Sequence, residues 1–130
     1  MVVSKNKNNK KFFITENGDY LNIHNICSGH SYYGRITLYF CQEEYVGYEL
    51  NKNESEQFLT LIEDSGYMCS PKNTAGIFWK IDQNNFVNIN AISSIIGKTI
   101  RLFKYKQTIE PKKLSDVDAL KKYLKDNNYA

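Results

Sequence analysis

Two histidines and two cysteines stand at spacings where they could act together. His24, Cys27 and His30 are each separated by two residues, and Cys41 follows. Imidazole nitrogen and thiolate sulfur are ligands that zinc prefers. Along a β-strand, however, His24 and Cys27 point to opposite faces, because successive side chains alternate. A nucleophilic Cys27 would also need an oxyanion donor and an orienting acid, and neither is identifiable. We therefore predict no metal site and no catalytic residues here.

Other catalytic motifs are missing from the sequence. It contains no Gly-rich phosphate loop, no H-E-x-x-H or G-x-S-x-G motif and no pair of catalytic carboxylates. We predict that the protein is not an enzyme and uses no cofactor.

One segment combines cations with aromatic rings, Lys98-Thr-Ile-Arg-Leu-Phe-Lys-Tyr-Lys106. If Ile100 and Leu102 face the core, strand alternation places the side chains of Arg101, Phe103 and Tyr105 on the opposite face. Single-stranded nucleic acids bind such surfaces, because bases stack on rings while cations follow the phosphates. The predicted nucleic-acid-binding residues are Lys98, Arg101, Phe103, Lys104, Tyr105 and Lys106. The alternative is that the rings belong to the core and the lysines solubilise an edge strand.

A second candidate surface lies at residues 30–34, His-Ser-Tyr-Tyr-Gly, which we interpret as a longer loop than its counterpart near residue 97. Tyrosine is enriched at protein interfaces, and loops concentrate recognition residues. The predicted protein-interaction residues are Tyr32, Tyr33, Glu43 and Glu44. Alternatively, the two tyrosines cap the end of a sheet.

An internal repeat organises the chain. Residues 12–26 align without a gap on residues 78–92, which pairs Phe12 with Phe78 and Asn22 with Asn88. Similarity at a fixed offset indicates a duplicated structural unit, although chance similarity between two hairpins is the alternative. Local hydrogen bonds in a turn explain the paired asparagines more simply than a shared ligand site does.

Each unit has the pattern of four strands followed by a helix. The predicted elements of the first unit are strands 12–15 and 20–27 around an Asn-Gly turn, strands 36–41 and 45–50, and a helix capped by Asn53 with Glu56 that ends at Gly66. Those of the second are a hairpin around residues 82–85, strands 86–93, 99–105 and about 107–113, and a helix capped by Ser115 with Asp118.

The predicted fold class is therefore α+β, with two ββββα repeats. Each repeat is an antiparallel four-stranded sheet with a C-terminal helix, and the two pack as one pseudo-two-fold domain, since a unit of about 60 residues is marginal alone. We predict a flexible basic tail over residues 1–11, a first repeat over 12–66, a linker over 67–77 and a second repeat over 78–130.

This tandem ββββα arrangement over residues 12–127 resembles the PUR-alpha repeat and the Whirly family. The resemblance concerns topology, because the Whirly Lys-Gly-Lys-Ala motif is missing and no PUR motif residue transfers to a position here. It implies that single-stranded nucleic acid binds on a curved sheet.

Charge is divided unequally between the repeats. The chain of 130 residues has a net charge of +3, but residues 12–66 carry two cations against nine anions and residues 67–130 carry eleven against five. The basic half would attract anionic partners, and the acidic half would repel them. Opposite charges on the two halves also permit a head-to-tail or an isologous homodimer.

Composition adds expectations about compartment and source. No apolar run approaches the roughly 20 residues of a membrane span, so we expect a cytoplasmic protein with no membrane partner. Three cysteines cannot all pair within one chain, which favours reduced thiols. The abundance of Asn, Lys, Ile and Tyr suggests an AT-rich genome, such as that of a low-GC bacterium or its mobile elements.

Together these features predict a non-enzymatic module that binds single-stranded DNA or RNA on the basic, ring-bearing sheet of the second repeat. The first alternative is a small phage or mobile-element protein that docks on a larger protein or nucleoprotein complex and inhibits it, in the manner of an anti-CRISPR protein. The other is a protein that sequesters a nucleotide signal.

Overall fold

The computed structural model describes residues 10–41, 47–71, 73, 75–103 and 108–130. Its elements in chain order are β1 (Phe12–Ile14), β2 (Tyr20–Asn22), the 3-10 turn η2 (Ile23–Asn25), β3 (Ile26–Tyr32), β4 (Arg35–Phe40), β5 (Gly47–Glu49), α1 (Lys52–Asp64), β6 (Phe78–Asp82), β7 (Asn85–Asn88), the 3-10 turn η3 (Ile89–Ala91), β8 (Ile92–Ile96), β9 (Thr99–Leu102), β10 (Thr108–Ile109) and α2 (Leu114–Asp126). None of the helices in these ranges is long and apolar enough to cross a membrane.

The fold is α+β, with two helices and antiparallel sheets among the described residues, but the sheets are not the predicted two of four strands. The strand orders are β1-β2, β5-β4-β3-β7-β6 and β10-β9-β8. The prediction is wrong because β7 pairs with β3, so the hairpin β6–β7 of the second half extends the sheet of the first half. The pseudo-two-fold packing of two repeats stays a prediction.

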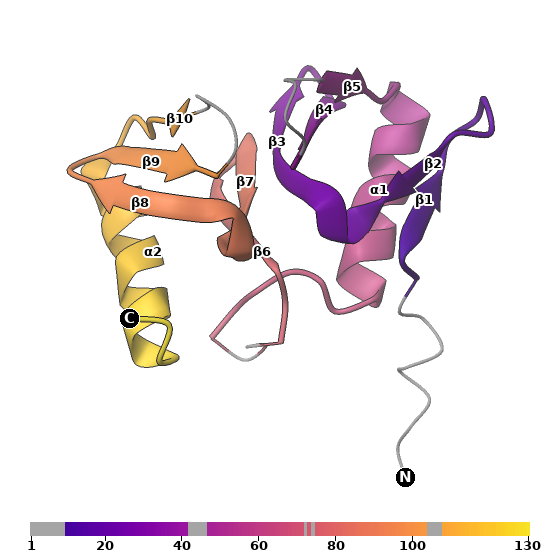
Figure 1. Ribbon diagram of the computed structural model, residues 1–130. Coiled ribbons are helices and arrows are strands. Elements are labelled where there is room, and N and C mark those ends of the chain that lie inside the picture. Colours follow the sequence, from indigo (N-terminus) through magenta and orange to yellow (C-terminus); the bar gives the residue numbers. More distant parts are fainter. Residues whose placement is uncertain (1–9, 42–46, 72, 74, 104–107) are drawn as a thin grey trace, which may run out of the picture.

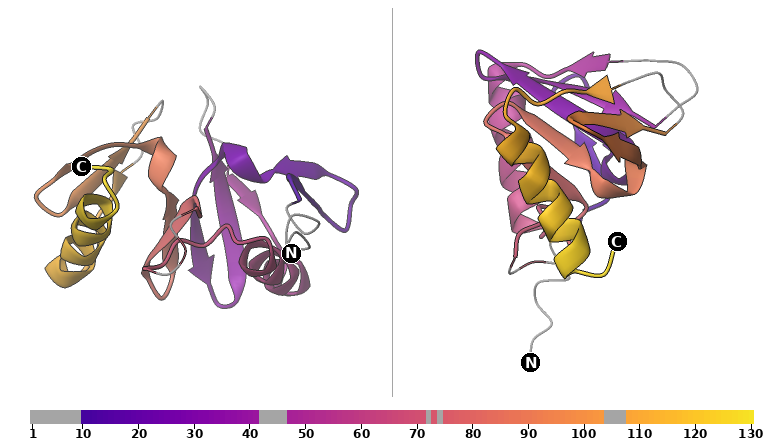
Figure 2. Two further views of the ribbon diagram at one scale, coloured as in Figure 1. Left: turned by 90° about the horizontal axis from the view of Figure 1, so that it is seen from below. Right: turned by 90° about the vertical axis from the view of Figure 1, so that its left-hand side faces the viewer.

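The three sheets follow one another across the molecule (Figure 1). The hairpin β1–β2 lies at one end beside α1, the five-stranded sheet lies in the middle, and the sheet β8–β9–β10 lies at the other end with α2 against it. Figure 2 shows the same order from below, with the two helices well separated. The N-terminal hairpin and β8 are therefore far apart within one chain.

Short 3-10 turns interrupt the two segments that the sequence predicts as continuous strands. The side chain of Asn22 caps η2, and its Oδ1 accepts from the His24 N–H at 3.0 Å. Asn88 caps η3 in the same way, with its Oδ1 accepting from the Asn90 N–H at 2.9 Å. The prediction that local turn hydrogen bonds explain the paired asparagines is confirmed.

Two hydrophobic clusters form the core. The first joins both halves, because Phe78 and Phe86 of the second hairpin pack with Phe13, Phe58 and other residues of the first half. The second is formed largely by the second half, with Ile100, Leu102 and Leu120 among its buried members. Of the predicted linker, Tyr67 and Cys69 are buried in these two clusters.

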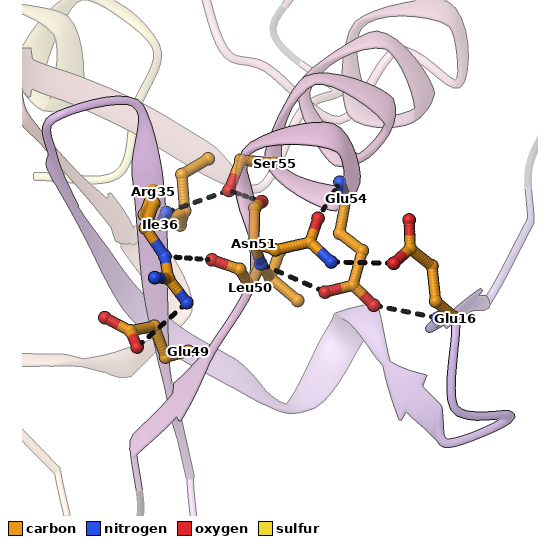
Figure 3. A network of polar contacts seen from close by, with 8 residues as sticks. All are labelled: Glu16, Arg35, Ile36, Glu49, Leu50, Asn51, Glu54 and Ser55. Carbon is orange, nitrogen blue, oxygen red and sulfur yellow. Dashed lines mark hydrogen bonds and ion pairs between the residues drawn. The ribbon is translucent and has the colours of Figure 1, made fainter.

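The two helices begin differently from the predictions. Helix α1 is capped by Asn51, two residues before Asn53, and forms a capping box. The Asn51 side chain accepts from the Glu54 N–H at 2.7 Å, and the Glu54 carboxylate accepts from the Asn51 N–H at 3.0 Å (Figure 3). Helix α2 has Lys113 as its N-cap without a side-chain hydrogen bond, so the predicted box of Ser115 with Asp118 is not formed.

The α1 network also holds the first hairpin in place (Figure 3). Glu54 is buried, and its carboxylate accepts a second backbone hydrogen bond, from the Glu16 N–H at 2.8 Å. The Glu16 carboxylate in turn accepts from the Asn51 and Asn53 side chains at 2.7 and 2.9 Å. These hydrogen bonds lower the pKa of Glu16. The β1–β2 turn is thus fastened to the N-terminus of α1.

Candidate nucleic-acid interface

Strand β9 divides its side chains between the core and the surface. Ile100 and Leu102 are buried in the second cluster. Arg101 is exposed, and Phe103, directly after the strand, is 53% exposed. The Phe103 N–H donates to the Ala91 carbonyl at 2.8 Å, which fixes its backbone beyond the strand end. A guanidinium and a phenyl ring therefore stand on the outer side of this sheet.

The turn before β9 supplies a third predicted residue. Gly97 and Lys98 connect β8 to β9, and Gly97 has a φ of +60°, which glycine adopts without strain. Lys98 is half-buried, and its ammonium lies 3.5 Å from the Lys112 carbonyl oxygen. The lysine is held at the end of the sheet, three positions before Arg101 in the chain.

Further cations lie on the segment that enters α2 and on the helix itself. The exposed lysines there are Lys112, Lys113, Lys121, Lys122 and Lys125. Lys122 pairs with Asp126 at 2.6 Å on the helix surface. Within the part of the chain that the structure describes, Arg101 makes no ion pair. Its charge is therefore available to an anionic partner.

Three of the predicted binding residues lie outside the described ranges, namely Lys104, Tyr105 and Lys106, which fall between β9 and β10. The structure thus gathers Lys98, Arg101 and Phe103 at one sheet. We name these three residues the β9 surface.

The tyrosine pair lies on a tight turn. Tyr33 and Gly34 form a two-residue connection between β3 and β4, with φ of +50° and +77°. Since β8 and β9 are also joined by two residues, the predicted longer loop is wrong, and the additional residues extend β3 instead. Tyr32 and Tyr33 are 66% and 79% exposed, and their ring centroids lie 4.4 Å apart. Glu43 and Glu44 fall outside the described residues.

The histidines and cysteines do not gather at one place. The His30 imidazole lies 2.9 Å from the Asn85 side-chain oxygen, whereas that of His24 lies against Tyr67. Cys27 and Cys41 have their sulfur atoms 3.3 Å apart. The hydrogen bond with Cys41 and burial raise the pKa of Cys27, which keeps it a neutral thiol. No group of three or more metal-binding side chains occurs among the described residues.

No family model matches the chain, and no curated protein matches it. A solved structure does: a LytTr DNA-binding domain of a putative methyl-accepting/DNA response regulator from Bacillus cereus. It has a TM-score of 0.51 and 16% sequence identity, and the match covers 87% of this chain and 94% of that chain. The fold is similar to that of a LytTr domain.

This LytTr-like fold corrects the resemblance to PUR-alpha and Whirly proteins. The predicted order of strands and helices suited those families, but the solved structure that this β-rich fold matches is a LytTr domain. The central sheet of this chain is built from both halves. Strand order within a sheet is decided by pairing between distant segments, which a comparison of element order does not reveal.

Sequence reasoning missed one surface of this fold. The outer face of β1–β2 exposes Phe12, Ile14 and Tyr20. The prediction from the sequence placed this hairpin in a four-stranded sheet and named no such face. The signal was available, because these apolar residues alternate with the buried Phe13 and Leu21. A strand whose two faces are both apolar is typical of a strand that is covered on both sides.

Proposed function

We propose that the protein is a non-enzymatic module that binds DNA through the β9 surface. The observation that carries the proposal is the joint exposure of Arg101 and Phe103 on the basic half of the chain. A LytTr-like fold supports it, because the similar structure is a DNA-binding domain. The exposed lysines around α2 would add sequence-independent attraction to phosphates.

Single-stranded DNA or RNA is the form that this surface favours. The Phe103 ring is accessible to an unpaired base, whose stacking on an aromatic ring stabilises a complex by roughly 1–3 kcal/mol. Arg101 lies two positions before the ring on the outer side of the sheet, and Lys98 lies at the other end of β9. Both cations would contact phosphates of the bound nucleic acid.

The test measures affinity for a fluorescent single strand and for the matching duplex at several salt concentrations. We expect salt-sensitive binding that is tighter to the single strand. Arg101→Gln should weaken it and lower the slope of log affinity against log salt by about one, because one phosphate contact is lost. Phe103→Ala should weaken binding to the single strand by roughly five-fold or more.

The chain offers matched controls for both variants. Arg35→Gln removes the other arginine, which pairs with Glu49 on the acidic half, and Tyr32→Ala removes an exposed ring at the end of β3. Neither should change the affinity. Equal losses for the controls, or no salt-sensitive binding to either polymer, would reject the proposal. Tighter binding to the duplex would retain DNA binding and remove the single-strand preference.

The exposed tyrosine pair favours a second candidate function, a protein-binding face. Two neighbouring rings at 66% and 79% exposure offer a large contact area at low entropic cost. Wild-type protein should capture a partner from extracts of a plausible host, and the double variant Tyr32→Ala with Tyr33→Asn should not. Inhibition of that partner and sequestration of a nucleotide signal stay predictions.

A further inference from the structure

The outer face of the N-terminal hairpin is apolar and uncovered by the rest of the described chain. Phe12, Ile14 and Tyr20 are 44%, 53% and 65% exposed, and we name these residues the hairpin face. The Phe12 and Tyr20 rings contact each other edge to face, with centroids 6.1 Å apart. Apolar residues gathered on one exposed face mark a surface that binds another molecule.

The second hairpin shows how such a face is covered. In β1–β2, Phe12 lies opposite Asn22 and Ile14 opposite Tyr20. In β6–β7, each partner is displaced by 66 residues, so Phe78 lies opposite Asn88 and Lys80 opposite Phe86. The Phe78 and Phe86 rings also meet edge to face, at 5.1 Å, but both are buried.

A junction with β3 and α1 buries these rings. Strand β7 pairs with the edge of β3, with Phe86 opposite Gly29. The Ser31 N–H donates to the Asn84 carbonyl at 2.7 Å, and the Asn88 side chain donates to the Ile26 carbonyl at 2.9 Å. The Phe86 ring stacks on Phe58 of α1 at 6.3 Å. We name this contact the β3–β7 junction.

The other end of the molecule carries a matching edge that is open. Strand β8 is an edge strand of its sheet within the described ranges. Its pairing with β9 has an irregularity between Ile92 and Ser94, as the pairing of β3 with β4 has between Ile26 and Ser28. Ile95 therefore takes the place of Gly29. The neighbouring Ile96 is 65% exposed, so this edge is also apolar.

Helix α2 stands beside this edge as α1 stands beside β3. The helices have equal lengths, and Leu120 and Leu124 occupy the helix positions of Phe58 and Ile62. Leu120 is buried and Leu124 is half-buried. An aromatic ring placed against β8 would meet aliphatic side chains of α2, as Phe86 meets Phe58.

We propose that the hairpin β1–β2 of one chain docks on β8 and α2 of a second copy with the strand pairing and register of the β3–β7 junction. Ile95 stands where β3 has Gly29, so the Tyr20 ring would pack beside the Ile95 side chain and not across the strand as Phe86 does. The register would place Tyr20 opposite Ile95 and Asp19 opposite Ile96. Aromatic and β-branched side chains are favourable cross-strand partners. The hairpin and β8 lie at opposite ends of one chain, so the contact joins separate molecules (Figure 1).

Charge supports a second copy as the occupant. Residues 12–66 carry seven more anions than cations, whereas residues 67–130 carry six more cations than anions. The docked hairpin would bring its acidic turn, with Glu16 and Asp19, to the turn that contains Lys98. Each chain has one hairpin face and one β8 edge, so the contact is head to tail and extends from chain to chain.

Sedimentation velocity without nucleic acid tests the proposal on the full chain. Wild-type protein should form larger species as its concentration rises. Tyr20→Asp removes the central ring of the hairpin face, and Ile95→Pro removes an edge N–H of β8. Each should raise the dissociation constant at least ten-fold, whereas Tyr32→Asp, an equally exposed tyrosine elsewhere, should not. Ile96→Asp, which sets two carboxylates opposite each other, repeats the test if Ile95→Pro does not fold.

Mixing the variants distinguishes this geometry from others. Tyr20→Asp keeps its β8 edge and the β8 variant keeps its hairpin, so an equimolar mixture should form dimers that grow no further. A β8 variant that still associates alone would show a symmetric hairpin contact and overturn the proposal. A monomeric wild type at all concentrations, or a mixture that stays monomeric, would also overturn it. Because no nucleic acid is present, failure here leaves the proposed function untouched.

Discussion

Two tyrosines of the core differ in how their hydroxyls are accommodated. The Tyr67 hydroxyl donates to the Lys10 carbonyl at 2.7 Å. The buried Tyr123 hydroxyl has no hydrogen-bond partner within the described part of the chain. Burial raises the pKa of both phenols, because a phenolate loses its hydration in the core. The nearby Cys69 thiol also raises the pKa of Tyr123. The two tyrosines thus differ in that the Tyr67 hydroxyl has a backbone hydrogen-bond partner and the Tyr123 hydroxyl has none among the described residues.

We predict that Tyr123→Phe leaves the free energy of unfolding at pH 7 unchanged or raises it by about 1 kcal/mol, whereas Tyr67→Phe lowers it by about 1 kcal/mol. A raised pKa in the folded state means that stability is complete below pH about 10 and falls as the pH rises, since the unfolded chain ionises first. Tyr123→Phe should therefore lose less stability than wild type between pH 9 and 11. Urea unfolding at both pH values measures this, and equal losses would contradict it.

At the scale of elements, the two helices have unequal N-termini. Asn51 and Glu54 satisfy backbone donors at the start of α1, but Lys113 at the start of α2 satisfies none with its side chain. A helix N-terminus is less stable without a side-chain cap, and a cation there is repelled by the positive end of the helix dipole. Helix α2 is consequently the element that a better cap would improve.

We predict that Asn51→Ala lowers the free energy of unfolding by roughly 1 kcal/mol and that Lys113→Asp raises it by about 0.5–1 kcal/mol. Lys112→Asp is the matched control, because it makes the same charge change one residue before the cap. Urea unfolding without nucleic acid measures all three variants. A gain for Lys112→Asp as large as that for Lys113→Asp would show that charge, rather than capping, is responsible.

At the scale of the whole molecule, one glycine allows the two halves to join. A Cβ atom on Gly29 would lie 2.2 Å from the Phe86 ring, which is itself packed against Phe58 and Phe78. Only a glycine in β3 lets this ring lie across the strand. The central sheet of five strands therefore depends on a residue without a side chain.

We predict that Gly29→Ala lowers the free energy of unfolding by roughly 1–3 kcal/mol through overpacking. Because this loss of stability arises from contact with one ring, Gly29→Ala should lower the free energy of unfolding by at most half as much in a Phe86→Leu background. A double-mutant cycle in urea measures this difference. If the effects of the two substitutions are additive, the loss of stability in Gly29→Ala arises from the β3 backbone and not from the Phe86 ring.

Individual residues show how far the sequence predicts the candidate site. Alternation along β9 was enough to assign Ile100 and Leu102 to the core and Arg101 to the surface, because the two faces of a strand differ in polarity. The start of α1 was misplaced by two residues. Asn51 and Asn53 are each followed three residues later by a glutamate. The fold selects Asn51, because its partner Glu54 also accepts from the Glu16 N–H across the fold.

The sequence by itself determined local features: the order of most strands and helices, the Asn-Gly turn of the first hairpin, and the sides of β4 and β9 that face the core. These follow from side-chain chemistry within a few residues. Only the tertiary structure decided that β7 joins β3, and hence that the described residues form sheets of two, five and three strands. The edge of every strand presents the same N–H and C=O groups, so its pairing partner depends on which distant side chains fit across it, as Phe86 fits over Gly29.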